Sequence, residues 1–142
     1  MKVKDLMSGS VIDIGAGETV TVAARMLEHY NIGALPVRDE NGTLCGMVTD
    51  RDIVTRCLAS GRSAENTRVR EVMTSQLHTV SPDMDISVAA HLMGRQQIRR
   101  LPVTENGKVC GILSLGDLAG CEECAYDAAD AYNDIANGVS RR

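Results

Sequence analysis

Aromatic side chains are nearly absent from this 142-residue chain, which contains no Phe, no Trp and only three Tyr. The hydrophobic fraction of 44% must therefore come almost entirely from aliphatic residues, Met and Cys. Proteins that bind single-stranded nucleic acid stack bases on aromatic faces, and this composition nearly excludes such a platform. An excess of positive charge is missing too, because the formal net charge is −4. A nucleic-acid partner is therefore not expected.

Long hydrophobic runs are also missing. No apolar stretch approaches the roughly 20 residues that a membrane-spanning helix needs, so no membrane association is expected. The first residues, Met1 to Asp5, do not lead into an apolar segment that would suit a signal peptide. These features predict a cytoplasmic protein, in which the five cysteines remain thiols.

The chain does contain an internal repeat, in which segments of the first half recur 65 or 66 residues later. The matching pairs are Val3–Met7 with Val69–Met73, Ile32–Val37 with Ile98–Val103, and Cys45–Thr49 with Cys110–Ser114. Each copy alone is too small to bury much apolar surface. We therefore expect the two copies to share one closed unit with pseudo-twofold symmetry.

Each copy has the pattern of a β-α-β-β-α unit. Short strands are predicted at residues 11–14 and 77–80, and helices start near Thr19 and Asp85, which are good N-caps. Two apolar runs joined by Asn41-Gly42 predict a hairpin, and a second helix follows from Asp50. The expected fold class is α/β (α+β), with repeat 1 at residues 1–66 and repeat 2 at residues 67–120.

Residues 121–142 are predicted to form an acidic C-terminal helix and tail. The stretch from Asp117 to Asp134 has six acidic residues and no Lys or Arg. Apolar residues recur there at helical spacing, at Ala125, Ala128, Ala129, Tyr132, Ile135 and Ala136. Packing on the protein itself or on a partner subunit is one interpretation, and a docking site for another protein is the alternative.

The order of elements, with Leu35-Pro36-Val37 before the hairpin turn and Gly46-Met47-Val48-Thr49 after it, both repeated, resembles the CBS (cystathionine beta-synthase-type) domain family. The resemblance covers residues 3 to about 120. It implies a stand-alone tandem pair that binds AMP, ADP, ATP, S-adenosylmethionine or NAD-type ligands in clefts between its copies. It also implies a homodimer.

The resemblance further implies the ligand-binding residues. The signature Gly-hydrophobic-hydrophobic-Thr/Ser-x-x-Asp occurs twice, and it assigns ribose and phosphate contacts to Thr49, Asp52, Ser114 and Asp117. A carboxylate can accept charge-assisted hydrogen bonds from ribose hydroxyls. Adenine would lie at Gly33, Ala34, Arg99 and Arg100, with Arg100 also neutralising phosphate. The cleft walls would include Ile12, Thr79 and Val80, and His78 would contact phosphate in the cleft that does not hold Asp117.

The two signature motifs, the two arginines and His78 each have a structural alternative. Thr49-x-x-Asp52 and Ser114-x-x-Asp117 also match a loose capping box, which needs no ligand. Arg99 and Arg100 can be a solvated pair of charges, and His78 can be a half-exposed strand residue. Cys45 and Cys110 fit buried small hydrophobes.

One further cysteine pattern is Cys121-x-x-Cys124. Structural zinc usually needs four ligands, and no second pair lies nearby in the sequence, so no metal site is predicted. Thiol or metal sensing through Cys121 and Cys124 stays an alternative.

The favoured function is a regulatory, non-catalytic sensor of energy or metabolite state that needs no cofactor and acts through its homodimer or an effector protein. No nucleophile, base and orienting group form a catalytic set, so an enzyme is not expected. The alternative is a structural or protein-interaction module with a vestigial nucleotide site.

Overall fold

The computed structural model describes residues 1–138 and contains mixed helices and strands in two compact units. Unit 2 is the continuous segment Ile12–Leu77, whereas unit 1 combines Met1–Val11 with the chain from His78 onward. The α/β (α+β) class with two related units is therefore confirmed. Among the described residues, no helix is both long enough and apolar enough to span a bilayer.

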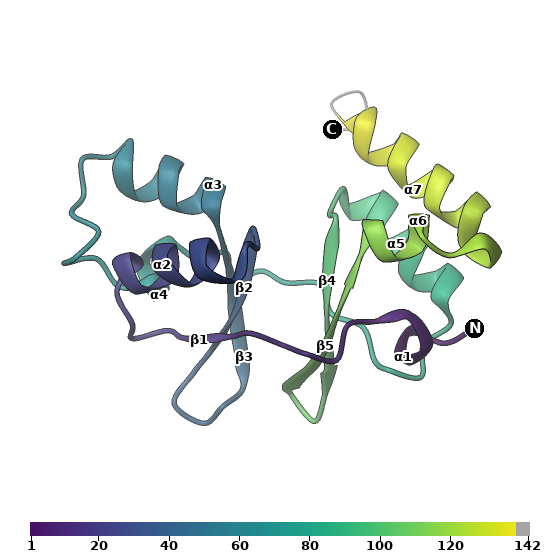
Figure 1. Ribbon diagram of the computed structural model, residues 1–142, viewed down its shortest axis with the longest axis horizontal. Coiled ribbons are helices and arrows are strands. Elements are labelled where there is room, and N and C mark those ends of the chain that lie inside the picture. The colour runs from purple at the N-terminus through teal and green to yellow at the C-terminus, as the bar shows by residue number, and fades with distance from the viewer. Residues whose placement is uncertain (139–142) are drawn as a thin grey trace. The chain divides into compact units, whose positions relative to one another are not determined.

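Unit 2 contains the first hairpin and the helices around it (Figure 1). Its elements are β1 (Ile14–Gly15), α2 (Val20–Tyr30), β2 (Ala34–Arg38), β3 (Leu44–Thr49), α3 (Asp50–Asp52), the π-helical η1 (Ile53–Leu58) and α4 (Val69–Val72). The sheet has the order β1-β2-β3, with β1 parallel and β3 antiparallel to β2.

Unit 1 repeats this plan and adds the C-terminal helix. Its elements are α1 (Val3–Leu6), α5 (Ile86–Gln96), β4 (Arg100–Glu105), β5 (Lys108–Ser114), α6 (Leu115–Ala119), the 3-10 helix η2 (Glu122–Cys124) and α7 (Ala125–Ala136). Strands β4 and β5 form an antiparallel pair. Residues 139–142 of the predicted C-terminal tail lie outside the described residues.

The helix starts and hairpin turns agree with the sequence. Thr19 Oγ1 accepts a hydrogen bond from the Val22 amide, and the Asp85 carboxylate accepts one from the Ser87 amide. Both hairpin turns place Gly at positive φ, at Gly42 and Gly107, where a side chain would be strained.

The predicted first strands are mostly wrong. In unit 2 the strand is only Ile14–Gly15, and in unit 1 only Val80 forms a bridge, to Val103. The reason is that a parallel partner is available for only one or two residues at the edge of each hairpin, so the remaining β-favouring residues stay outside regular strands.

The start of each repeat packs on the other repeat's hairpin. The Val3 amide donates to the Met84 carbonyl at 2.9 Å, and Ser8 forms a bridge with Ile112. In unit 2, Thr74 forms the equivalent bridge with Met47. Val3 and Val69 are both fully buried in these units. The N-terminal segment of each sequence repeat therefore contributes to the core of the unit that holds the other hairpin.

Helix α7 lies along α5 in unit 1 (Figure 1). Ala128 and Ala131 are buried at this contact, at 7% and 2% exposure. Gly94 of α5 allows the close approach, because a Cβ there would lie 3.3 Å from the Ala131 Cα and 2.7 Å from an Asp134 carboxylate oxygen. The C-terminal helix expected from the sequence is thus part of the unit 1 core.

Gly46 and Gly111, the glycines of the two signatures, lie where a bridging segment passes over a hairpin strand, here called the crossing. A side chain at either position would clash with that segment. A Cβ on Gly46 would lie 2.5 Å from the Met73 sulfur and 3.0 Å from the Thr74 carbonyl oxygen. A Cβ on Gly111 would meet Met7 and the Ser8 carbonyl oxygen at 2.4 and 3.0 Å. Within residues 1–138, Gly9 has no heavy atom within 4 Å of its Cβ position apart from its own and those of its two chain neighbours.

We predict that Gly46→Ala and Gly111→Ala each lower the free energy of unfolding by about 1–3 kcal/mol, because the added methyl group overpacks the crossing. Gly9→Ala serves as the matched control and should leave stability unchanged or slightly raised. Thermal or urea unfolding monitored by circular dichroism measures the difference. Equal stability of all three variants would contradict this account of the crossing.

Candidate functional site

Both signature motifs form a closed capping box at the start of a helix. In unit 2, the Thr49 hydroxyl accepts from the Asp52 amide at 3.0 Å, and an Asp52 carboxylate oxygen accepts from the Thr49 amide at 3.0 Å. In unit 1, Ser114 and Asp117 make the same pair at 3.0 and 2.8 Å. The capping interpretation is therefore correct for both motifs. It also places each carboxylate at a junction of strand and helix.

The hairpin register brings the predicted adenine-contacting residues beside these junctions. Ala34 pairs with Thr49, and the Asp50 amide donates to the Gly33 carbonyl at 3.1 Å. In the other unit Arg100 pairs with Ser114, and the Leu115 amide donates to the Arg99 carbonyl at 2.8 Å. Residues more than a dozen positions apart in sequence thus meet at equivalent places in the two units.

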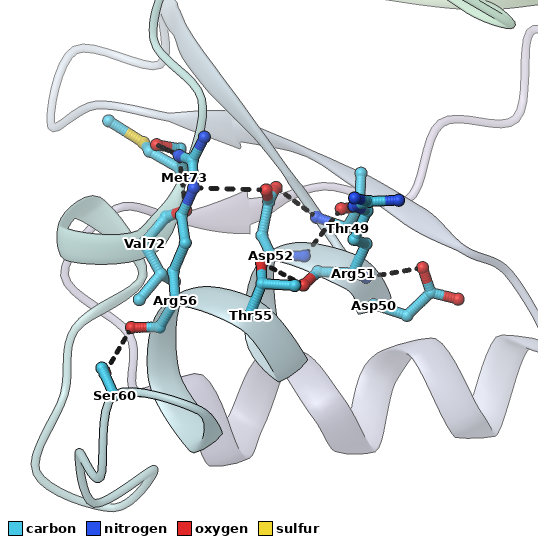
Figure 2. Close-up of polar contacts among 9 residues, drawn as sticks. All are labelled: Thr49, Asp50, Arg51, Asp52, Thr55, Arg56, Ser60, Val72 and Met73. Carbon is cyan, nitrogen blue, oxygen red and sulfur yellow. Dashed lines mark hydrogen bonds and ion pairs between the residues drawn. The ribbon is translucent and has the colours of Figure 1, made fainter.

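The Asp52 carboxylate in unit 2 has a further cationic neighbour. Its second oxygen lies 3.7 Å from the Arg56 Nε, and Asp52 is 9% exposed. The Arg56 guanidinium also donates to the carbonyls of Val72 and Met73, at 3.2 and 3.1 Å (Figure 2). Sequence reasoning missed Arg56, although its i,i+4 spacing from Asp52 was an available signal.

The Asp117 carboxylate in unit 1 has no such neighbour. The position equivalent to Arg56, 65 residues later, is Cys121. Within residues 1–138, one Asp117 oxygen accepts from Ser114 and the other has no hydrogen-bond or ion-pair partner. Asp117 is half-buried, so this oxygen is the more available of the two signature carboxylates for a ligand.

A pocket of about 740 Å3 adjoins the unit 1 junction. It is lined by Arg99, Arg100, Ser114, Leu115, Gly116, Ala119, Ala125, Ala128, Ala129, Tyr132 and Asn133. The first three were expected at a ligand site, whereas the wall from α7 was not. Part of the predicted apolar stripe of α7 therefore faces this pocket, and Ala128 and Ala131 are buried in the unit.

The remaining predicted residues lie elsewhere in their units. His78 and Thr79 are exposed, and Val80 is 2% exposed and belongs to the unit 1 core. Ile12 is half-buried just before β1. His78, Thr79 and Val80 are outside the lining of the 740 Å3 pocket.

The cysteines have differing surroundings. Cys45 and Cys110 occupy equivalent half-buried positions, where burial raises the pKa of each thiol. Cys124 is 1% exposed. Burial, a hydrogen bond with Cys121 and the charges of Cys121, Asp127 and Glu123 together raise the Cys124 pKa to about 11. This thiol therefore stays protonated at neutral pH.

Comparison with known proteins gives two matches to one family model, the CBS domain, at residues 3–59 and 69–121. The chain is 40% identical over 135 residues to the CBS domain-containing protein YhcV of Bacillus subtilis, covering 95% of each chain. It is similar in structure to Hypoxic Response Protein I, solved with two coordinated zinc ions (TM-score 0.78, 32% identity, covering 84% of this chain and 98% of that one).

A second solved structure is similar to this chain and contains bound ligands. It is the CBS domain pair of protein MJ0100 in complex with 5′-methylthioadenosine and S-adenosyl-L-methionine. The TM-score is 0.74 at 30% sequence identity, covering 84% of this chain and 94% of the other.

The capping boxes can be tested separately from any ligand. We predict that Thr49→Ala and Ser114→Ala each destabilise the protein by about 1 kcal/mol, because each leaves a helix-start amide without its acceptor. Thr49→Ser and Ser114→Thr retain the hydroxyl and are the matched controls. In thermal unfolding, each Ala variant should have a lower melting temperature than its hydroxyl-bearing control. Equal melting temperatures would contradict a stabilising role for the capping boxes.

Proposed function

The chain belongs to the CBS domain family, and on that premise we propose that it is a regulatory, non-catalytic protein that binds an adenosine-type ligand. The observation that carries this proposal is the unit 1 pocket, which is lined by two arginines, the helix-start residue Ser114 and an apolar helix face. Asp117 is not itself in the lining, but its carboxylate is held by the capping box that it forms with Ser114. These groups suit the separate parts of a nucleotide.

The pocket has the size and chemistry that such a ligand requires. Its volume of about 740 Å3 is within the range of roughly 300–1,000 Å3 for small-molecule sites. The Ala residues and Tyr132 of α7 offer an apolar wall for a base. Arg99 and Arg100 offer planar, bidentate donors that match phosphate oxygens.

The free Asp117 oxygen supplies the acceptor for a sugar. Its partner oxygen is held by the Ser114 amide, so the carboxylate is oriented before any ligand arrives. Hydrogen bonds to a charged acceptor contribute more than those between neutral groups, on the order of 1.5–3 kcal/mol. A ribose with two adjacent hydroxyls is the fitting donor.

The arginines favour a phosphorylated ligand within the adenosine class. The structural relative MJ0100 binds 5′-methylthioadenosine and S-adenosyl-L-methionine, which supports the class. Neither compound carries phosphate, whereas two guanidinium groups line the pocket here. We therefore propose AMP, ADP or ATP as the ligand, ahead of S-adenosylmethionine.

The two units are proposed to differ in affinity. In unit 2 the Asp52 carboxylate has both oxygens engaged, one by Thr49 and one beside Arg56. A ribose there would have to compete with the Arg56 pair. Unit 1 is accordingly the primary site, and unit 2 binds more weakly or takes a different ligand.

The output of binding is proposed to pass through α7 and a partner. Helix α7 lines the pocket on one side and exposes other residues, among them Asp130, so a bound ligand would contact a helix that other molecules can reach. An effector protein or a second copy of the chain would bind α7 differently when the ligand is present. The protein would then act as a cytoplasmic sensor of energy or metabolite state. A module with a vestigial site is the competing function, favoured only if no ligand binds.

Ligand binding can be tested on carboxylate variants. Asp117→Asn should keep the capping box, because an amide oxygen can still accept from Ser114, while losing the charged acceptor. We predict near-normal melting and at least a tenfold loss of affinity for AMP or ATP by calorimetry. Asp117→Ala should lose the same affinity and about 1 kcal/mol of stability as well. Asp52→Asn alters the unit that is proposed to bind more weakly, so it should leave the affinity of the unit 1 site nearly unchanged.

The phosphate contact has its own variant in the same experiment. Arg100→Ala should weaken AMP or ATP more than adenosine, because only the phosphates meet the guanidinium. Arg95, which is exposed and outside the pocket lining, provides the control Arg95→Ala, with unchanged affinity. If ligand-free wild-type protein binds no adenosine compound at millimolar concentration, the sensor proposal fails and the interaction module replaces it.

We also expect a homodimer, on the strength of family resemblance and the Met-rich first helices. Light scattering with the purified chain at micromolar concentration should give twice the monomer mass of 15.2 kDa. A monomer at every concentration would rule out the dimer while leaving the ligand proposal standing.

A further inference from the structure

Three sulfur atoms gather where η2 leads into α7. The Cys121 and Cys124 sulfurs are 3.0 Å apart, and the Met1 sulfur lies 3.8 Å from the first and 3.9 Å from the second. Cys124 is 1% exposed, Cys121 is half-buried and Met1 covers them from the start of the chain. We propose that Met1, Cys121 and Cys124, here called the sulfur triad, bind one soft monovalent cation, Cu(I).

The distances suit a three-coordinate ion. With metal–sulfur bonds of about 2.3 Å, three ligands around one ion in a plane are roughly 4.0 Å apart. The two distances that involve Met1 are already close to this value. Only the two thiols must separate, by about 1 Å, which small side-chain rotations can supply.

The ligand type selects the metal. Thiolate and thioether sulfurs are soft donors that prefer Cu(I). Structural zinc requires four ligands, and within residues 1–138 no group of three or more His, Cys, Asp and Glu side chains converges on one point. Two thiols and one thioether therefore fall short of a zinc site and complete a three-sulfur site.

The charge balance of binding follows from the ligands. Each thiol releases its proton to solvent, so two thiolates and one Cu(I) leave a net charge of −1 on the site. The acidic side chains of Asp127 and Glu123 raise the Cys124 pKa and so oppose this proton release. The soft metal–sulfur bonds, and not the local charge, must therefore supply the affinity.

The site is separate from the proposed nucleotide pocket. Cys121 and Cys124 precede α7, and the pocket is lined by later residues of that helix, from Ala125 to Asn133. A bound ion would link the start of the chain to the beginning of this helix. The proposal does not require nucleotide binding, and loss of either function leaves the other testable.

The test is a titration of fully reduced protein with Cu(I) in the absence of oxygen, against a competing Cu(I) chelator. We expect one ion per chain with a thiolate-to-copper absorption band. Cys121→Ser and Cys124→Ala should abolish it, and Met1→Leu, made behind a cleavable tag, should weaken affinity at least tenfold. Cys45→Ser and Cys110→Ser remove isolated half-buried thiols and should bind as wild type does.

A second measurement avoids the variants, in case one of them fails to fold. Cu(I) should protect Cys121 of the wild-type chain from alkylation and leave the other half-buried thiols as reactive as before, as mapped by mass spectrometry. The proposal is overturned if the Cys121→Ser and Cys124→Ala double variant binds Cu(I) like wild type, or if Zn2+ binds the same residues with equal stoichiometry. It is also overturned if reduced wild type binds no Cu(I) and instead forms a Cys121–Cys124 disulfide with an oxidised small thiol.

Discussion

The structure depends on a pair of backbone crossings, one in each unit, at which a segment from the start of one repeat forms a bridge with the last strand of the other repeat's hairpin. Met47 meets Thr74 in one unit and Ile112 meets Ser8 in the other. Each crossing holds the strand that leads directly into the capping box, so the position of the signature carboxylate depends on it. The glycine that begins each signature is required by this close approach and need not contact any ligand.

The same backbone carries different chemistry in the two units. Both capping boxes have nearly the same hydrogen-bond lengths. One helical turn later, Arg56 in the first repeat becomes Cys121 in the second, and this single difference changes what the aspartate faces. An arginine that also binds the carbonyls of Val72 and Met73 makes Asp52 part of a structural network, whereas Asp117 keeps one oxygen for another molecule.

Helix α7 joins the functions proposed for unit 1. Its buried side packs on α5 through Ala128, Ala131 and the space at Gly94, and this fixes the helix in place. A neighbouring part of its surface closes one side of the pocket, and the cysteines at its beginning meet Met1. The first repeat has no counterpart of this helix. Unit 1 therefore has a wall and a sulfur cluster that unit 2 lacks within the described residues.

The sequence by itself determined the repeat, the class of fold, the helix caps and the hairpins, because these depend on local spacing and on turn residues such as Asn41-Gly42. It also singled out Arg99, Arg100 and Ser114, which line the unit 1 pocket and which belong to short motifs; their contact with a ligand stays a prediction. Only the tertiary structure decided that Arg56 engages Asp52, that part of α7 faces a pocket, and that Met1 reaches Cys121 and Cys124. These arrangements depend on which segments meet in space, and a side chain 120 residues away leaves no mark in the local pattern. The short first strands have the same cause, since their length is set by the partner strand available and not by their own residues.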